Sequence, residues 1–155
     1  MLTLIKSLYL LSLIVWIGTI VFFSFVGAPG IFRSLSPVDA GKVVGVIFPN
    51  YYILGYVCGT ILLLAAAWLR NAAASQGEWS LVTALAGLML ALTLYAGLAI
   101  QPRAAALRPQ LHEEATAATV KPEFDRLHHR AVQLNAAVLL AGLVVTILTA
   151  RSLKP

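Results

Sequence analysis

Four hydrogen-bonding side chains beside the long apolar runs of this sequence have the types and spacing to do chemistry. Asn50 follows a Phe-Pro pair, Gln101 precedes a proline, and His128 and Asn135 lie seven residues apart at the start of the last apolar run. Polar groups at membrane depth are energetically costly, so each is a candidate site by default. Histidine titrates near neutral pH and can relay protons. The four residues therefore predict a polar cluster with a small-solute or proton-linked role.

A metal or haem site is the second hypothesis for the same region. His128 and His129 are the metal candidates, but adjacent side chains point about 100° apart on a helix and share one ion poorly. There is no His-x-x-x-His pair, a spacing that places two imidazoles on one helix face. Asp125, four residues before His129, is expected to orient that imidazole through a hydrogen bond. We expect no cofactor.

Catalytic motifs are missing from the sequence. It has no G-x-S-x-G elbow, no glycine-rich phosphate loop with its lysine, and no pair of carboxylates within an apolar run. Cys58 has no neighbouring cation to activate it and is predicted to be a small packing residue. We expect no catalytic residues, and a protein that is not an enzyme.

The composition places these residues in a membrane protein. Of 155 residues, 60% are hydrophobic and only 11% are charged, with a mean hydropathy of +0.88. Average soluble domains carry roughly a quarter charged residues, so a water-soluble enzyme is excluded. The net charge of +5 comes from basic residues that punctuate apolar runs. This placement predicts attraction to anionic lipid headgroups rather than nucleic-acid binding.

Four apolar runs are each near the roughly 20 residues that cross a bilayer as a helix. We place them at about 7–29, 51–69, 79–100 and 131–150 of a single domain, 1–155. The second begins near Tyr51 because Pro49 and Asn50 interrupt the run before it. The first lacks the short apolar core of a signal peptide and is expected to remain uncleaved. The predicted fold is all-α, an integral membrane four-helix bundle.

The connection between the third and fourth runs carries a pattern of its own. Residues from about 102 to 121 place Leu107 and Leu111 on one face and charges elsewhere, which predicts an amphipathic interfacial helical segment. Lys121 and Pro122 are expected to break the chain there. Pro122 would then lie in the first turn of the fourth helix.

The distribution of basic residues predicts the orientation of the bundle. The side with both termini carries four basic residues, and the side with the first and third connections carries more. The positive-inside rule places those connections in the cytoplasm and both termini outside a cell or inner membrane. The connections carry Arg33, Lys42, Arg103, Arg108, Lys121, Arg126 and Arg130, and the terminal side carries Lys6, Arg70, Arg151 and Lys154.

Small residues indicate how the helices associate. Gly55 and Gly59 form a small-xxx-small step, which in membranes lets two helix backbones approach closely. We interpret the step as packing inside the bundle. A homodimer through the same glycines, or a role as a structural subunit with a membrane partner, is the alternative.

The pattern over nearly the whole chain resembles the transmembrane protein 205-like family, four-helix membrane proteins of unknown function. The resemblance rests on A-G-x-x-x-G-x-x-F-P-x-Y-Y and on F-x-x-L-H-x-x-x-x-x-x-N. It implies that His128 and Asn135 are pattern positions along with a further five residues. These five are Gly41, Phe48, Pro49, Tyr51 and Phe124.

A looser likeness links the first run to copper-resistance and haem-biosynthesis membrane proteins, which place a histidine seven residues before W-x-G. Here Tyr9 stands seven residues before Trp16. The replacement of the histidine weakens the haem or metal role that this likeness implies.

Overall fold

Long helices account for nearly all of the described residues, 1–72 and 76–152, of the computed structural model. Lipid offers the backbone no hydrogen-bond partners, and a helix satisfies its amides internally. Four helical segments are long and apolar enough to cross a membrane: Leu2–Ser34, Pro37–Ala72, Gly77–Leu111 and Ala115–Ser152. The predicted all-α fold is confirmed, and the chain is a multi-pass membrane protein.

Two of these segments, the first and the third, are composed of several elements in sequence. η1 and η2 are π-helical turns within the first and third segments, and η3 is a 3₁₀ turn. In chain order the elements are α1 (Leu2–Phe22), η1 (Phe23–Gly27), α2 (Ala28–Ser34), α3 (Pro37–Ala72), α4 (Gln76–Tyr95), η2 (Ala96–Ile100), α5 (Gln101–Leu107), η3 (Pro109–His112) and α6 (Glu114–Ser152).

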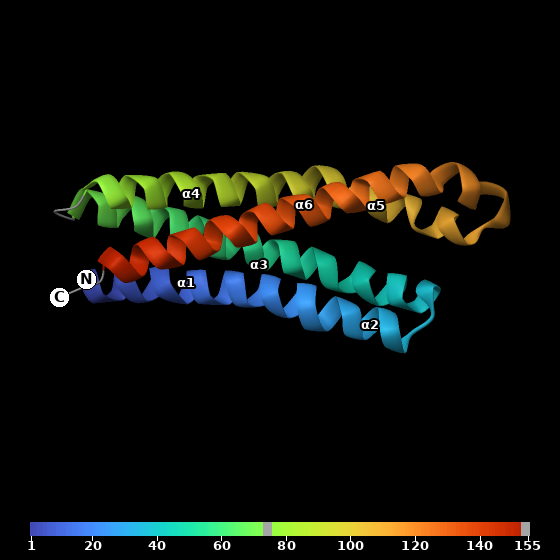
Figure 1. The fold of residues 1–155 in the computed structure, drawn as a ribbon, viewed down its shortest axis with the longest axis horizontal. Coiled ribbons are helices and arrows are strands. Elements are labelled where there is room, and N and C mark those ends of the chain that lie inside the picture. The colour runs from blue at the N-terminus through green and yellow to red at the C-terminus, as the bar shows by residue number, and fades with distance from the viewer. Residues whose placement is uncertain (73–75, 153–155) are drawn as a thin grey trace.

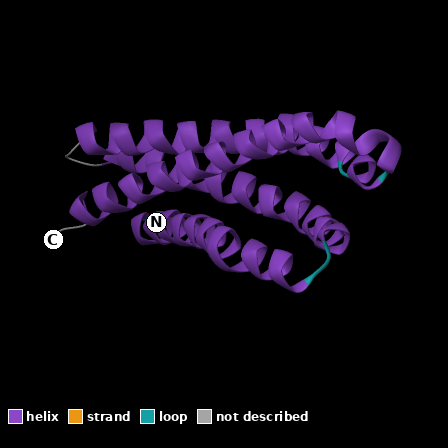
Figure 2. Cartoon of the chain, turned by 45° about the vertical axis from the view of Figure 1, so that its right-hand side comes forward, coloured by secondary structure: helices purple, strands orange, loops and turns teal. Residues whose placement is uncertain are grey.

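The helices form an up-and-down bundle (Figures 1 and 2). α1 begins and α6 ends at one end of the bundle, while the α2–α3 connection and the α5–η3–α6 turn lie at the other. α3 packs between α1 and α4, and α6 packs against α4 and α1. Short connections between antiparallel neighbours are typical of this architecture.

Trp16 of α1 fills the centre of the bundle, where two glycines of α3 make room for it. A Cβ atom at Gly59 would lie 2.8 Å from Cη2 of Trp16, and one at Gly55 would lie 3.3 Å from its Nε1. Both glycines are buried, and Leu90 and Thr93 of α4 also lie close to them. Gly55 and Gly59 therefore serve packing inside the bundle, as predicted.

A second buried contact closes the bundle near the chain ends. The hydroxyl of Tyr9, 1% exposed, lies 2.6 Å from Oγ1 of Thr149 in α6. The Tyr9 ring meets the Trp79 ring edge to face, with centroids 5.5 Å apart. Tyr9 therefore joins α1, α4 and α6 through packing and one hydrogen bond.

The helix of the second apolar run begins earlier than the predicted span. α3 runs unbroken from Pro37 through Pro49 to Ala72, so the predicted interruption before Tyr51 is absent. Proline removes one helical hydrogen bond, here to the carbonyl of Gly45. Ending the helix there would expose several more backbone groups to hydrocarbon, so continuing it is the less costly solution.

The interfacial connection also differs from the prediction. α5 ends at Leu107 and η3 follows, and the chain reverses at Glu113, whose backbone is extended (φ −96°, ψ 119°). α6 starts at Glu114 and contains Pro122 as an internal residue. The predicted break at Lys121–Pro122 is therefore wrong. Pro122 costs one backbone bond on an exposed, charged stretch of α6, where water can replace it.

Candidate functional site

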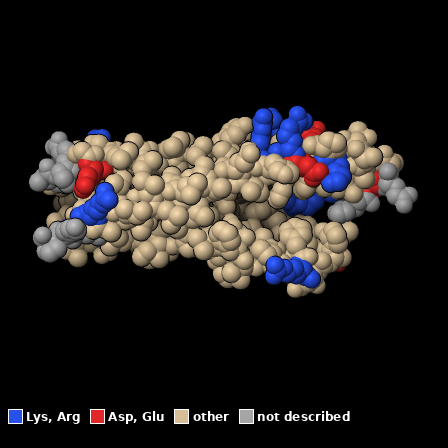
Figure 3. Space-filling view, viewed as in Figure 1, with Lys and Arg blue, Asp and Glu red and all other residues tan. Residues whose placement is uncertain are grey.

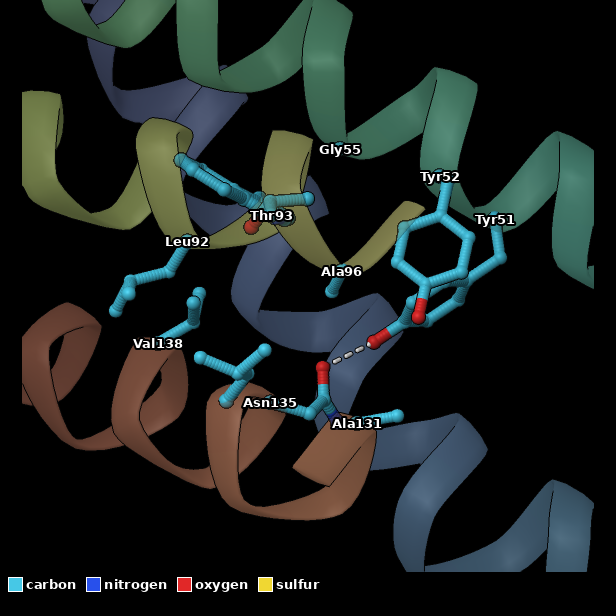
Figure 4. A pocket seen from close by; sticks show the side chains of 11 residues that line it. Tyr51, Tyr52, Gly55, Leu92, Thr93, Ala96, Ala131, Asn135 and Val138 are labelled. Carbon is cyan, nitrogen blue, oxygen red and sulfur yellow. Dashed lines mark hydrogen bonds between the residues drawn. The ribbon is translucent and has the colours of Figure 1, made fainter. Parts of the chain in front are cut away.

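Three helices meet at a polar side-chain network within the bundle. The hydroxyl of Tyr51 in α3 donates to Oδ1 of Asn135 in α6 at 2.7 Å. Nδ2 of Asn135 in turn donates to Oγ of Ser24, in the π-helical turn η1, at 3.2 Å. Figure 4 shows the Tyr51–Asn135 bond beside the labelled residues of α4. The amide of Asn135 therefore joins η1, α3 and α6.

Aromatic rings surround this network, which we call the Tyr51–Asn135–Ser24 site. Phe23 lies 5.5 Å, centroid to centroid, from both Phe48 and Tyr51. Tyr51 and Tyr52 meet edge to face at 5.4 Å. Aromatic groups that carry a hydroxyl present an apolar body and a polar tip, which suits a small polar site in an apolar bundle.

A cavity of about 10 Å³ lies at the site, and Asn135, Tyr51 and Thr93 are among its lining residues (Figure 4). A cavity of this size has room for roughly one water molecule. Polar atoms are available around it, since a hydroxyl and an amide reach its wall. The arrangement can bind a water-sized polar group between α1, α3, α4 and α6.

Both π-helical turns lie at this level of the bundle. η1 supplies Ser24, and η2 supplies Ala96 to the cavity wall. The next residue of η2, Gly97, lies against the Tyr52 ring, where a Cβ atom would be 2.7 Å from ring carbons, and against the Tyr56 hydroxyl. π-helical turns are rare and frequently occur at functional sites. The presence of two π-helical turns beside one polar network supports this region as the candidate functional site.

The structure places the four residues of the predicted polar cluster in different surroundings. Asn135 is in the network, whereas Asn50 is exposed and donates to the carbonyl of Val46 in its own helix at 3.5 Å. Gln101 is half-buried at the start of α5, and His128 is exposed on α6. Within the part of the chain that the structure describes, no hydrogen bond joins any two of the four. Among the four, Asn135 is the one for which the structure describes hydrogen bonds to other helices.

The two histidines interact mainly with their own helix. The His128 ring stacks on Phe124 with centroids 6.3 Å apart, and it meets His129 at 6.2 Å. His129 Nδ1 lies 2.7 Å from the backbone carbonyl of Asp125, so this residue orients the imidazole through its main chain. The Asp125 carboxylate instead accepts from Lys121. Among residues 1–72 and 76–152, no group of three or more His, Cys, Asp or Glu could hold a metal ion.

The remaining pattern positions divide between this site and its surroundings. Phe48 and Tyr51 belong to the aromatic surround, while Pro49 is exposed on α3 and Phe124 supports His128. Gly41 lies under the side chain of Arg108. Sequence reasoning did not single out Ser24. A serine flanked by phenylalanines within an apolar run was the available signal for Ser24.

A domain of unknown function, DUF4149, matches residues 11–113. The chain belongs to the DUF4149 family. The matched residues include Ser24, Tyr51 and Arg108, whereas Asn135 lies beyond them. No curated protein and no solved structure matches this DUF4149 protein.

Proposed function

We propose that this DUF4149 protein binds and passes a small, uncharged polar solute at the Tyr51–Asn135–Ser24 site. The observation that carries the proposal is the hydrogen bond from Tyr51 to Asn135 across α3 and α6, beside a cavity. Both side chains also offer polar atoms that a solute hydroxyl or amide could bind. We also infer that the chain is related to the transmembrane protein 205-like family, on the pattern positions named above.

The chemistry of the site favours a solute over a proton relay. Serine and asparagine do not titrate in water, and a tyrosine hydroxyl ordinarily titrates at about pH 10. Histidine ordinarily titrates near neutral pH, but His128 is exposed on α6 and stacks on Phe124. A proton pathway would need such a group in the network, so hydrogen bonding to an uncharged solute is the better use of these residues.

Passage requires the helices around the cavity to separate, because the present space holds roughly one water molecule. η1 and η2 are both widened turns, and η1 supplies Ser24 to the network while η2 supplies Ala96 to the cavity wall. A widened turn that relaxes to α-helical geometry shifts the register of the residues beyond it. Ser24 and Ala96 would then move relative to Asn135, which supports these two turns as the moving parts.

The test is solute entry into liposomes that contain the purified protein. Urea and glycerol are the probes, and stopped-flow light scattering follows the volume recovery after an osmotic step. We expect recovery to be faster than in protein-free liposomes for at least one probe. Asn135→Leu, which keeps the side-chain size but removes both hydrogen-bonding groups, is expected to return the rate to the protein-free value.

Asn50→Leu is the matched control, because it makes the same chemical change at an exposed position outside the network. It should retain wild-type rates. Wild-type rates equal to those of protein-free liposomes with both probes would overturn the proposal. Rapid acidification of the lumen, reported by trapped pyranine under a potassium diffusion potential, would instead support a proton-linked function.

The orientation proposal is that the α2–α3 connection and the α5–η3–α6 turn face the cytoplasm. Lys and Arg side chains gather at that end (Figure 3), which supports it by the positive-inside rule. Of the basic residues counted for the other side, Lys154 lies outside the described residues. A phosphatase that is active only outside the cytoplasm, fused to the C-terminus, should be active in cells. Activity only for a fusion placed between α5 and α6 would reverse the orientation.

A further inference from the structure

Arg108 connects the third segment to α3 at the charged end of the bundle. It follows α5, and its Nη1 donates to the carbonyl of Gly41 in α3 at 3.2 Å. Its side chain is half-buried, although arginine is ordinarily among the most exposed residues. Half-burial of a permanent cation needs a physical reason.

Two glycines of α3 let Arg108 approach the helix backbone. A Cβ atom at Gly45 would lie 2.9 Å from Nη1 of Arg108, and one at Gly41 would lie 3.3 Å from its Cδ. The glycines are one helical turn apart, so together they form a shallow seat without side chains. The seat fixes the position of the guanidinium group against α3.

No carboxylate neutralises this cation within the described residues. The two ion pairs there join Lys42 to Asp39 at 3.0 Å and Lys121 to Asp125 at 2.9 Å, so these carboxylates are already paired. A guanidinium has five N–H donors, and the single bond to Gly41 uses one of them. No side-chain nitrogen or oxygen in the described residues is both buried and without a partner. The other donors of Arg108 are therefore accessible.

The surroundings of Arg108 suit an anion at the membrane boundary. Figure 3 shows Lys and Arg side chains gathered near this end of the molecule, with fewer Asp and Glu side chains among them. The elements on either side of Arg108, α5 and η3, both pack against α6. The apolar spans end here and charged residues begin, so the phosphate groups of a bilayer would lie at this depth.

We propose that Arg108, seated on Gly41 and Gly45, binds a phosphate group. A guanidinium fork matches two phosphate oxygens with two parallel N–H donors, which a lysine ammonium cannot do. The phosphate can belong to a phospholipid headgroup or to free inorganic phosphate, because both offer the same pair of oxygens. This site is separate from the Tyr51–Asn135–Ser24 site and does not depend on its function.

The experiment measures binding to the full chain in detergent, with phosphatidylglycerol, phosphatidylcholine and inorganic phosphate as separate probes. Native mass spectrometry counts bound lipid and gives the dissociation constants, and equilibrium dialysis measures the free phosphate. We expect saturable binding of at least one probe. Arg108→Gln should weaken it about tenfold, as loss of charged hydrogen bonds does. Lipid binding alone identifies a headgroup site, and phosphate binding alone identifies a soluble anion site.

Three variants separate a built site from general charge. Arg103→Gln removes an exposed arginine of α5 and should leave binding unchanged. Arg108→Lys keeps the charge but not the fork and should bind more weakly than wild type. Gly45→Ala keeps Arg108 and, because only the flexible end of that side chain must move, should fold and still bind more weakly.

Equal losses for Arg103→Gln and Arg108→Gln would overturn the proposal, as would wild-type binding in all variants or no saturable binding of any probe. If Arg108→Gln fails to fold, Gly45→Ala decides: unchanged binding there contradicts the site, and weaker binding supports it.

Discussion

Gly59→Ala is expected to lower the free energy of unfolding of the bundle by about 1–3 kcal/mol, the usual cost of overpacking a close-packed interior. The added Cβ atom would lie 2.8 Å from Cη2 of Trp16 and 2.9 Å from Cδ1 of Leu90. The Trp16 ring is rigid and 3% exposed, so it has little room to move away. Titration of the protein in mixed micelles with sodium dodecyl sulfate, followed by circular dichroism, measures the loss.

Gly18→Ala is the matched control, because it makes the same change in a transmembrane helix where nothing lies within 4 Å of the new Cβ atom. Alanine is the better helix former, so Gly18→Ala should be neutral or slightly stabilising. Trp16→Phe removes the ring atoms that contact Gly59. In the Trp16→Phe background, Gly59→Ala should lower the free energy of unfolding by a smaller amount. If Gly59→Ala lowers the free energy of unfolding equally in the wild-type and Trp16→Phe backgrounds, the close approach of Trp16 is not the reason that a larger residue is unfavourable at position 59.

Hydropathy predicted the four spans because hydrocarbon imposes one requirement on all of them, internal satisfaction of the backbone. It predicted the helix ends less well, and the prolines explain why. Pro49 and Pro122 each lie inside a helix, while Pro109 opens the 3₁₀ turn where the fourth segment separates from the third. A proline costs about the same local hydrogen bond at every such position. Whether the helix ends at a proline depends on whether the backbone groups that would be freed there face hydrocarbon or water. That depends on the tertiary structure.

The candidate site, like the helices, was only partly predictable from the sequence. The sequence identified Asn135, because an amide beside an apolar run is conspicuous. It favoured Asn50 as a partner, whereas the neighbouring Tyr51 makes the bond. Adjacent residues point about 100° apart, so the rotation of α3 about its axis decides between them. Ser24 lies in a π-helical turn, whose extra residue shifts every later side chain around the helix. Counting at 3.6 residues per turn does not find it.

Tyr51→Phe and Asn135→Leu are expected to be coupled by about 1 kcal/mol in the free energy of unfolding, within the range measured for interhelical hydrogen bonds in membranes. Tyr51→Phe deletes the donor and leaves Oδ1 of Asn135 without it. Asn135→Leu leaves the Tyr51 hydroxyl and Ser24 without their partner. Each single variant therefore loses the Tyr51–Asn135 bond and leaves a polar group without its partner. The double variant loses the same bond only once, so its loss of unfolding free energy should be smaller than the sum of the two single losses.

Tyr52→Phe is the control for this cycle, since it deletes a neighbouring hydroxyl for which the structure describes no hydrogen bond. It should change stability little and show no coupling to Asn135→Leu. The same detergent titration measures wild type, the three single variants and the two double variants. Strictly additive losses for Tyr51 and Asn135 would mean that the bond contributes nothing to holding α3 against α6. Coupling in stability, combined with solute entry that is lost in Asn135→Leu but kept in Tyr51→Phe, would assign Tyr51 to holding the helices together and the Asn135 amide to the solute. The cycle therefore distinguishes a role of the Tyr51–Asn135 bond in holding the helices together from a role of these residues in binding solute. The flux measurement alone does not distinguish them.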